Sequence, residues 1–201
     1  MNRPQRRIVL ASRSPRRREL ALAAGWDVVL VPPPETAESS APPRASGETL
    51  EAYVLRLARA KAAAVDASGV TGTILACDTL SELDGEALGQ PIDRDDARRM
   101  LEALSGRPHR VVTGVCLWHR PLAPLEATDE SRLEMGTLDA SFLEWYLDAG
   151  LWRGKAGACG FQDERLPLRL VSGSPSNVVG LPLERVEAML EDLDRLSGNA
   201  G

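Results

Sequence analysis

Histidine and cysteine are scarce in this chain of 201 residues, which has two histidines, His109 and His119, and three cysteines, Cys77, Cys116 and Cys159. The cysteine count is odd, and neither a CxxC pair nor an HExxH spacing occurs. These absences argue against a disulfide framework and against a zinc site, and they predict three reduced, mostly buried thiols. Any hydrolytic chemistry must therefore rest on carboxylates, with a hard cation that prefers oxygen ligands.

Long apolar runs are also missing, since none approaches the roughly 18 residues needed to cross a bilayer. The N-terminus, MNRPQRRIVLAS, begins basic, but its apolar stretch covers only about four residues, which is too short for a signal peptide. We therefore expect a cytoplasmic protein with no membrane partner. Residues 8–11 are better interpreted as a first, buried strand.

An excess of positive charge is lacking as well. The formal net charge is −5, whereas a general duplex-DNA binder is expected to show the opposite balance. Positive charge gathers locally, at Arg3, Arg6 and Arg7 and again at Arg13 and residues 16–18. This pattern favours a small anionic ligand and argues against a nucleic-acid partner.

Hydrophobic periodicity and turn residues predict interleaved strands and helices. The expected strands cover residues 8–11, 26–31, 73–77, 110–118, 132–136 and 168–171. The expected helices cover residues 15–24, 48–67, 139–147 and 182–196, and a further helix is capped by Asp93 and ended by Gly106. A hairpin turns at Asp84-Gly85, residues 32–47 form a long loop, and residues 198–201 form a flexible tail. This order predicts an α/β fold in one domain over residues 1–201, with a mixed twisted sheet and flanking helices.

The turn between the first strand and the first helix combines hydroxyls with arginines, in the run Ser12-Arg13-Ser14-Pro15-Arg16-Arg17. Ser14 suits the N-cap position and Pro15 the first helical position. A helix N-terminus presents unpaired N–H groups and a partial positive charge, which favour phosphate, and arginine can bind phosphate through two parallel hydrogen bonds. The alternative is a well-capped helix with a solvated basic face.

A lysine and an aspartate stand out from their apolar surroundings. Lys61 falls near the middle of the helical stripe made by Leu50, Tyr53, Val54, Leu57 and Ala64. This position indicates either a functional amine or a side chain that extends past small neighbours to reach water. Asp78, followed by Thr79, comes directly after the buried run 74–77, and ligands usually bind at the carboxyl ends of strands in α/β sheets. A carboxylate there can bind magnesium or accept a proton from water, or it can simply open a turn.

Two further segments carry weaker signals. Glu35 lies early in the long loop, where most glutamates are merely solvated. Residues 172–177, which read Ser-Gly-Ser-Pro-Ser-Asn, suit a second phosphate-contacting turn, although turn chemistry alone explains them more readily.

Taken together, these segments resemble the Maf family of nucleotide pyrophosphatases, which is related in fold to the inosine-triphosphate pyrophosphatases. The resemblance covers nearly the whole chain in the family's order, at Leu10–Leu20, Glu35-Thr36, Leu57–Ala62, Ala76–Thr79, Leu104–Gly106, His109, Thr113–Val115, Lys155–Ala158, Gln162 and Ser176–Leu183. It implies two lobes around a nucleotide cleft. It also implies hydrolysis of nucleoside triphosphates to monophosphate and pyrophosphate with a divalent cation, Mg²⁺ or Mn²⁺.

The resemblance also implies a role for each matching residue. Asp78 would accept the proton of the attacking water and, with Glu35, hold the metal, and Lys61 would complete the catalytic set. The triphosphate would be held by Ser12, Ser14, Arg16, Arg17 and Lys61. Arg16, Thr79 and Gln162 match the branch that prefers dTTP and UTP, while 7-methyl-GTP is the alternative substrate.

Three positions depart from the family pattern: Gln90 replaces the lysine of Gly-Lys-Pro, Cys159 replaces a tyrosine, and Ser81 replaces an apolar residue. Gln90 would face the phosphates without the usual positive charge, which predicts a slow enzyme unless Arg94 or Arg98 supplies that charge. The rival interpretation from another class is a weakly active, nucleotide-binding regulator of septum formation. The family is also compatible with a homodimer.

Overall fold

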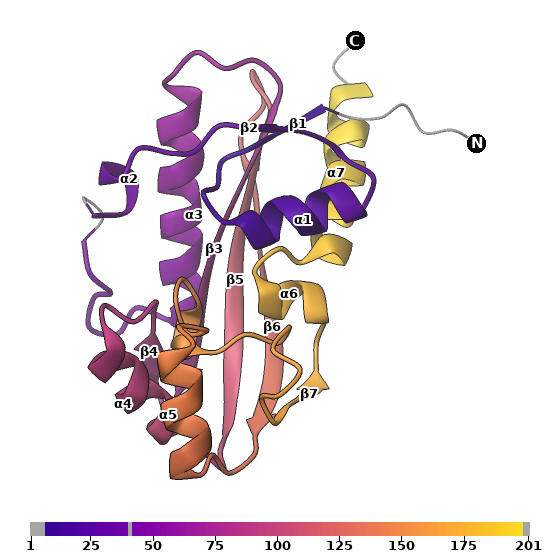
Figure 1. The fold of residues 1–201 in the computed structure, drawn as a ribbon. Coiled ribbons are helices and arrows are strands. Elements are labelled where there is room, and N and C mark those ends of the chain that lie inside the picture. Colours follow the sequence, from indigo (N-terminus) through magenta and orange to yellow (C-terminus); the bar gives the residue numbers. More distant parts are fainter. Residues whose placement is uncertain (1–6, 40–41, 199–201) are drawn as a thin grey trace. The chain divides into compact units, whose positions relative to one another are not determined.

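Residues 7–39 and 42–198, the part of the chain that this computed structural model describes, form a seven-stranded mixed sheet with helices beside it (Figure 1). The strands lie in the order β2-β1-β3-β5-β6-β7, and β4 pairs with β3. Strand β1 is parallel to β2 and to β3, whereas the β3–β4 and β6–β7 pairs are antiparallel. The predicted α/β class, with a mixed sheet and flanking helices, is confirmed.

The helices and strands follow one another in an interleaved order. They are β1 (Arg7–Leu10), α1 (Pro15–Ala23), β2 (Asp27–Leu30), α2 (Thr36–Ser39), α3 (Leu50–Asp66), β3 (Thr73–Leu83), β4 (Glu86–Leu88), α4 (Arg94–Leu104), β5 (Pro108–Trp118), β6 (Leu125–Met135), α5 (Ala140–Asp148), the 3₁₀ helix η1 (Ala156–Ala158), β7 (Leu168–Ser172), α6 (Pro175–Val179) and α7 (Leu183–Gly198).

The chain divides into two compact units. The first unit comprises the residues up to Asp78, residues 113–129 and the residues from Gly180 onward, and the second comprises residues 79–112 and 130–179. Strands β3, β5 and β6 each belong partly to one unit and partly to the other. Gly198 ends α7, and the rest of the predicted tail, residues 199–201, lies outside the described residues, as do residues 40–41 of the long loop.

In the first unit, β1 and β3 are buried on both faces, as their continuous apolar runs indicate. Leu75 and Cys77 of β3 pack in one cluster with α1 and α7, whereas Ile74 and Ala76 pack in another with α3. Side chains alternate along a strand, so the even-numbered positions of β3 in this unit face α3.

Polar side chains cap α1 and α3, and the cap of α1 is the predicted Ser14. The Ser14 hydroxyl accepts from the Arg17 N–H at the start of α1, and the Thr49 hydroxyl accepts from the Ala52 N–H at the start of α3. Such caps are worth about 1 kcal/mol each, because they satisfy N–H groups that have no partner within the helix. Gly25, with φ +78, follows α1 as expected.

The second unit is built on α4 and α5, whose buried residues share one core with Leu83 and Leu88 of the hairpin. Asp93 caps α4 by accepting from the Asp96 N–H. The hairpin between β3 and β4 turns at Asp84 and Gly85, which both have positive φ, 51° and 86°. That conformation is the one that a two-residue hairpin turn with Asp-Gly requires, so this prediction is confirmed.

The prediction that the third strand ends at Asp78 is wrong. Strand β3 runs from Thr73 to Leu83, with Asp78 in its interior. Strand β3 pairs with β1 as far as Leu75 and with β4 from Ser81 onward. The residues predicted to form the first arm of the hairpin therefore continue the same strand. Asp78 therefore lies beyond the carboxyl end of β1, and not at that of its own strand.

Three further predictions differ from the structure by more than one or two residues. Strand β6 begins at Leu125 and not near residue 132, and acidic residues in this additional part form ion pairs, such as Glu130 with Arg110. The long loop contains the four-residue helix α2. The segment interpreted as a turn at residues 172–177 includes the end of β7 and the start of α6 at Pro175.

The thiols behave as the composition predicts. Cys77 and Cys116 are buried, Cys159 is half-buried, and all three are free. Burial raises the pKa of Cys77 to about 11 and those of Cys116 and Cys159 to about 12. They are protonated at neutral pH and are poor nucleophiles. Among the described residues, no helix combines the length and apolar character that a membrane span needs.

Gly114 on β5 allows α3 to approach the sheet of the first unit closely. A Cβ atom at this position would lie 2.5 Å from the Val54 carbonyl carbon and 2.6 Å from the Leu55 nitrogen. Both are backbone atoms of α3, so the contact cannot be relieved by a side-chain rotation. The glycine therefore sets the distance between the sheet and the helix that carries Lys61.

We expect Gly114→Ala to lower the free energy of unfolding by about 1–3 kcal/mol, because the added methyl group overpacks this contact. Thermal unfolding would measure the change. Gly198→Ala is the matched control, since nothing lies within 4 Å of a Cβ there and its φ is not positive. Equal unfolding temperatures for the two variants would show that α3 can shift to accommodate the methyl group.

Candidate functional site

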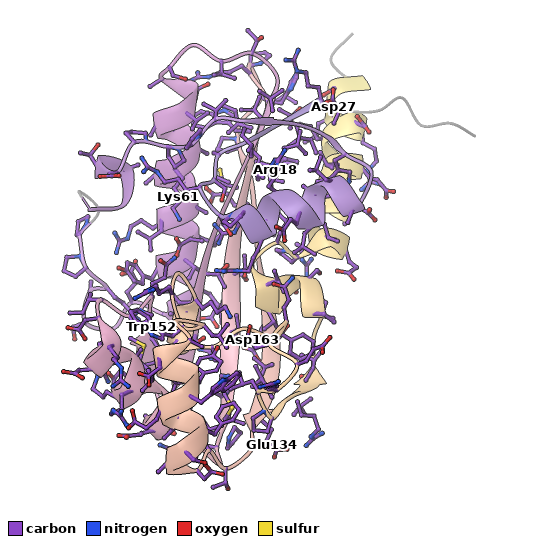
Figure 2. The ribbon with its side chains drawn as sticks, viewed as in Figure 1. Arg18, Asp27, Lys61, Glu134, Trp152 and Asp163 are labelled. Atoms are coloured by element: carbon purple, nitrogen blue, oxygen red, sulfur yellow. The ribbon has the colours of Figure 1, made fainter. Side chains whose placement is uncertain are left out.

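Lys61 and Asp78 form a buried ion pair in the first unit. Lys61 lies on α3 (Figure 2), and Asp78 occupies an even-numbered position of β3, on the face that α3 covers. The Lys61 Nζ atom donates to Oδ1 of Asp78 at 2.5 Å and to the Cys77 carbonyl oxygen at 3.4 Å. The two side chains are 6% and 10% exposed. Lys61 therefore does not extend to water, and that alternative for its place in the apolar stripe is wrong.

Such a pair is costly to bury, because each charge loses its hydration, and replacing a buried pair by apolar residues is often neutral or stabilising. Stability alone therefore does not explain why this pair is buried. Because the pair also lies beyond the carboxyl end of β1, it is a candidate functional site. The ammonium group also keeps the carboxylate in one orientation. A carboxylate held in one orientation is suited to general-base chemistry.

The turn before α1 has the geometry of an anion site. The Ser12 hydroxyl accepts from the Ser14 N–H at 3.1 Å, and the Ser14 hydroxyl accepts from the Arg17 N–H at 3.4 Å. A hydroxyl can accept and donate at the same time, so both serines can still donate to a phosphate oxygen. Ser12 is buried and Ser14 is half-buried.

The two arginines that follow lie on the first turn of α1. The Arg17 Nε donates to the Gly180 carbonyl at 2.7 Å, which ties α1 to the segment before α7. Arg16 and Arg17 are both half-buried. Their guanidinium groups add positive charge near the helix N-terminus, where phosphate is favoured.

A pocket opens beside this turn, also within the first unit. Its volume is about 670 Å³, and its lining consists of Ser12, Arg13, Leu30, Pro32, Pro33 and Pro34. These residues lie at or just after the carboxyl ends of the parallel strands β1 and β2, the usual position of a ligand site in such sheets.

Glu35 lies next to this pocket on an exposed segment. Its Oε1 atom accepts from Arg13 NH1 at 2.8 Å, and the Glu35 side chain is 86% exposed. Arg13 also donates twice to the Pro33 carbonyl, from Nε at 3.2 Å and from NH2 at 3.0 Å. Arg13 thus joins the turn before α1 to the segment that carries Glu35.

The remaining predicted site residues, Thr79, Gln90 and Gln162, belong to the second unit. Thr79 is half-buried on β3, whereas Gln90 and Gln162 are exposed. The Gly157 N–H donates to the Gly89 carbonyl at 3.0 Å, so the residue before Gln90 is held by the segment that leads to Gln162. The described structure therefore groups the predicted residues in two sets, one in each unit.

The sequence model of the family described as Maf-like protein matches residues 7–193 of this chain. The chain belongs to the Maf-like family. The resemblance inferred from the motifs is thereby confirmed.

Relatives of this chain carry the name dTTP/UTP pyrophosphatase. The protein of Rhodopirellula baltica is 43% identical over 94% of this chain and 82% of its own length. That of Anaeromyxobacter sp. strain Fw109-5 is 45% identical over 92% and 88%, and that of Pyrococcus abyssi is 37% identical over 92% and 95%. A solved structure of the Staphylococcus aureus Ham1 protein is 16% identical over 64% of this chain and 71% of that chain, with a TM-score of 0.42. A likeness that weak supports no conclusion about function.

The chemistry of the two predicted metal ligands of this Maf-like chain suits a hard divalent cation. Within residues 7–39 and 42–198, no group of three or more His, Cys, Asp or Glu side chains is placed to hold a metal ion. Mg²⁺ does not need such a group, because it commonly keeps several waters and binds one or two carboxylates together with substrate phosphates. Asp78 and Glu35, the predicted ligands, are carboxylates.

Several residues that shape the two sets were not singled out from the sequence. The sequence places Arg13 in a basic run, but nothing in a single sequence signals its contacts with Pro33 and Glu35. Gly114 belongs to a segment that resembles the family, but the sequence alone gives no physical reason for a glycine there. Tyr146 and Asp163 lie nine and eight residues from Lys155 along the chain, and no helical or strand period predicts that these side chains meet.

Proposed function

We propose that this chain hydrolyses pyrimidine nucleoside triphosphates, dTTP or UTP, to the nucleoside monophosphate and pyrophosphate. The observation that carries the proposal is the buried Lys61–Asp78 pair, in a unit that also presents the hydroxyl-rich N-terminus of α1. The Maf-like relatives named dTTP/UTP pyrophosphatase support it further, since the chain matches them over most of its length.

In this proposal, Asp78 accepts a proton from a water molecule that attacks the α-phosphorus. A bond forms between the water oxygen and that phosphorus, the α–β bridging bond breaks, and pyrophosphate leaves with the bonding electrons. Lys61 holds Oδ1 of Asp78, so the second carboxylate oxygen takes the proton. Lys61 also places a positive charge next to the developing negative charge.

The triphosphate is held by Ser12, Ser14, Arg16 and Arg17 in this proposal. The hydroxyls donate to phosphate oxygens, and the N-terminus of α1 adds its partial positive charge. Asp78 and Glu35 would hold a divalent cation, Mg²⁺ or Mn²⁺, which when bound neutralises phosphate charge and polarises the phosphorus. Glu35 can turn from Arg13 to a cation at little cost, because an exposed ion pair is worth less than about 1 kcal/mol.

Base choice is assigned to Arg16, Thr79 and Gln162, on the match to the branch that prefers pyrimidines. Gln162 carries an amide that both donates and accepts, so it can pair with the polar edge of a pyrimidine ring. Gln90 faces the phosphates as a neutral donor. The same chemistry on 7-methyl-GTP, and a nucleotide-binding regulator with little turnover, are the competing functions.

Hydrolysis in ¹⁸O-labelled water tests the proposal. With UTP and Mg²⁺ or Mn²⁺, we expect UMP and pyrophosphate in equal amounts, with the label in UMP, because the water oxygen bonds to the α-phosphorus. Label in pyrophosphate would mean attack at the β-phosphorus, and UDP with orthophosphate would mean attack at the γ-phosphorus. Either result contradicts the assignment. A higher kcat/KM for 7-methyl-GTP than for UTP or dTTP would favour the other branch.

A further inference from the structure

A second lysine–aspartate pair, half-buried, lies in the second unit, and the proposed mechanism does not use it. The Lys155 Nζ atom donates to both carboxylate oxygens of Asp163, at 2.6 and 2.5 Å, and the Tyr146 hydroxyl donates to Oδ2 at 2.5 Å. The Lys155 and Asp163 side chains are 13% and 14% exposed, and Tyr146 is fully buried. Asp163 lies in the segment between α5 and β7 (Figure 2).

Lys155, Asp163 and Tyr146 are all joined by hydrogen bonds within the cluster. These bonds compensate the free-energy cost of burying its charges. One carboxylate receives three hydrogen bonds, and the ammonium group also lies 5.9 Å from the centre of the Tyr146 ring. Burial and the hydrogen bond to Asp163 raise the pKa of Tyr146 far above its ordinary value, so its hydroxyl stays protonated and donates at neutral pH. Networks of this kind hold their members in one arrangement.

What the cluster holds is the turn that carries Gln162. The Asp163 N–H donates to the Gly160 carbonyl at 3.0 Å, and the Leu166 N–H donates to the Asp163 carbonyl at 2.8 Å. The Lys155 side chain lies directly over Gly160, where a Cβ atom would be 2.9 Å from its Cδ. Gln162 is exposed, but its turn is fixed on both sides by buried or hydrogen-bonded groups.

The same segment is fixed at its start to the strand that leads to Gln90. Gly157 has φ +66, a conformation that favours glycine, and its N–H donates to the Gly89 carbonyl at 3.0 Å. A Cβ atom there would lie 3.0 Å from the Ser81 hydroxyl oxygen. The backbone from Lys155 to Asp163 is thus tied down at Gly157 and at Asp163.

We infer that Tyr146, Lys155 and Asp163 are positioning residues for nucleobase selection. The inference rests on the proposed function and deepens it. An amide side chain discriminates between bases only if its backbone is held to within a few tenths of an ångström, and this cluster supplies that constraint to Gln162. The three residues act through Gln162 and do not themselves touch the base.

Tyr146→Phe tests the inference with the least disturbance, since it removes one hydroxyl and keeps the ring. The readout is the ratio of affinities for the α,β-methylene analogues of UTP and GTP, which bind without turnover. Losing one hydrogen bond from the network should lower this preference about 5-fold. In a Gln162→Ala background the same change should have no further effect, because the residue through which it acts is absent.

Tyr53→Phe is the matched control, because Tyr53 is the other tyrosine of the chain and belongs to the first unit. Lys155→Arg, which keeps the charge but crowds Gly160, serves as a second variant and should lower the same ratio. An unchanged ratio in both variants would overturn the inference. So would an equal fall in both affinities, or an effect that persists without Gln162, because each indicates a general structural role. Failure of the wild-type protein to form UMP and pyrophosphate would instead contradict the proposed function, and the affinity ratio would still test the cluster.

Discussion

Asp78→Asn should lower the turnover number for UTP by a factor on the order of 10² or more, because the amide cannot accept the proton of the attacking water. The side chain keeps its shape and its oxygen can still accept from Lys61, so nucleotide binding should survive. It should even tighten, since repulsion between the carboxylate and the phosphates is removed. Steady-state kinetics would measure turnover, and calorimetric titration with the methylene analogue of UTP would measure affinity.

The same change leaves Lys61 buried without a counter-charge, which typically costs 3–5 kcal/mol of stability when a buried pair is broken. Thermal unfolding therefore has to accompany the kinetics, and a folded variant with intact binding separates lost chemistry from lost structure. Asp27→Asn is the matched control, because Asp27 is an exposed aspartate of the same unit (Figure 2). Near-normal turnover of the Asp78 variant would move the catalytic base elsewhere, with Glu35 as the next candidate.

Gln90→Lys should raise the turnover number by a factor on the order of 10 to 10², because a single electrostatic contact to transition-state charge has about this effect. A charged donor is roughly twice as strong as a neutral one. The gain should appear in kcat more than in KM, since the charge on the leaving pyrophosphate develops mainly in the transition state. Steady-state kinetics with UTP would measure both parameters.

The alternative is that a neighbouring arginine, Arg94 or Arg98, supplies this charge by leaving an exposed ion pair, which costs little. Arg94 pairs with Glu144 at 2.7 Å and with Asp148 at 2.6 Å, and Arg98 pairs with Glu144 at 2.5 Å. Both guanidinium groups are therefore engaged with acidic side chains of α5. Gln90→Met, which removes the donor without adding charge, is the control and should not speed the enzyme. An unchanged or reduced turnover number for Gln90→Lys would show that the absence of a lysine at position 90 does not limit turnover.

Local signals in the sequence were sufficient wherever a feature depends on a few consecutive residues. Ser14 and Asp93 cap their helices, and Asp84-Gly85 turns the hairpin, because each acts on backbone groups within three residues of itself. Periodicity likewise placed Lys61 on the buried face of α3. The family and its candidate residues could also be inferred from the sequence, since each motif is a run of consecutive residues.

Features that depend on pairing between distant segments required the tertiary structure. The length of β3 could not be predicted, because its interior Asp78-Thr79 resembles a turn until β4 is seen to pair with the residues beyond it. The extent of β6 was hidden for a similar reason, since its acidic residues are suited to a strand only when arginines from other elements pair with them.

The sequence by itself determined the fold class, the helix and turn boundaries that caps define, and the candidates Lys61 and Asp78. Only the tertiary structure decided that these two side chains meet at 2.5 Å, that Arg13 holds Glu35, and that Tyr146 and Lys155 converge on Asp163. The physical reason is the range of the interactions. Caps and periodicity act over one or two turns, whereas a buried ion pair depends on how closely a helix and a strand pack, and here that distance is set by Gly114 on a third element.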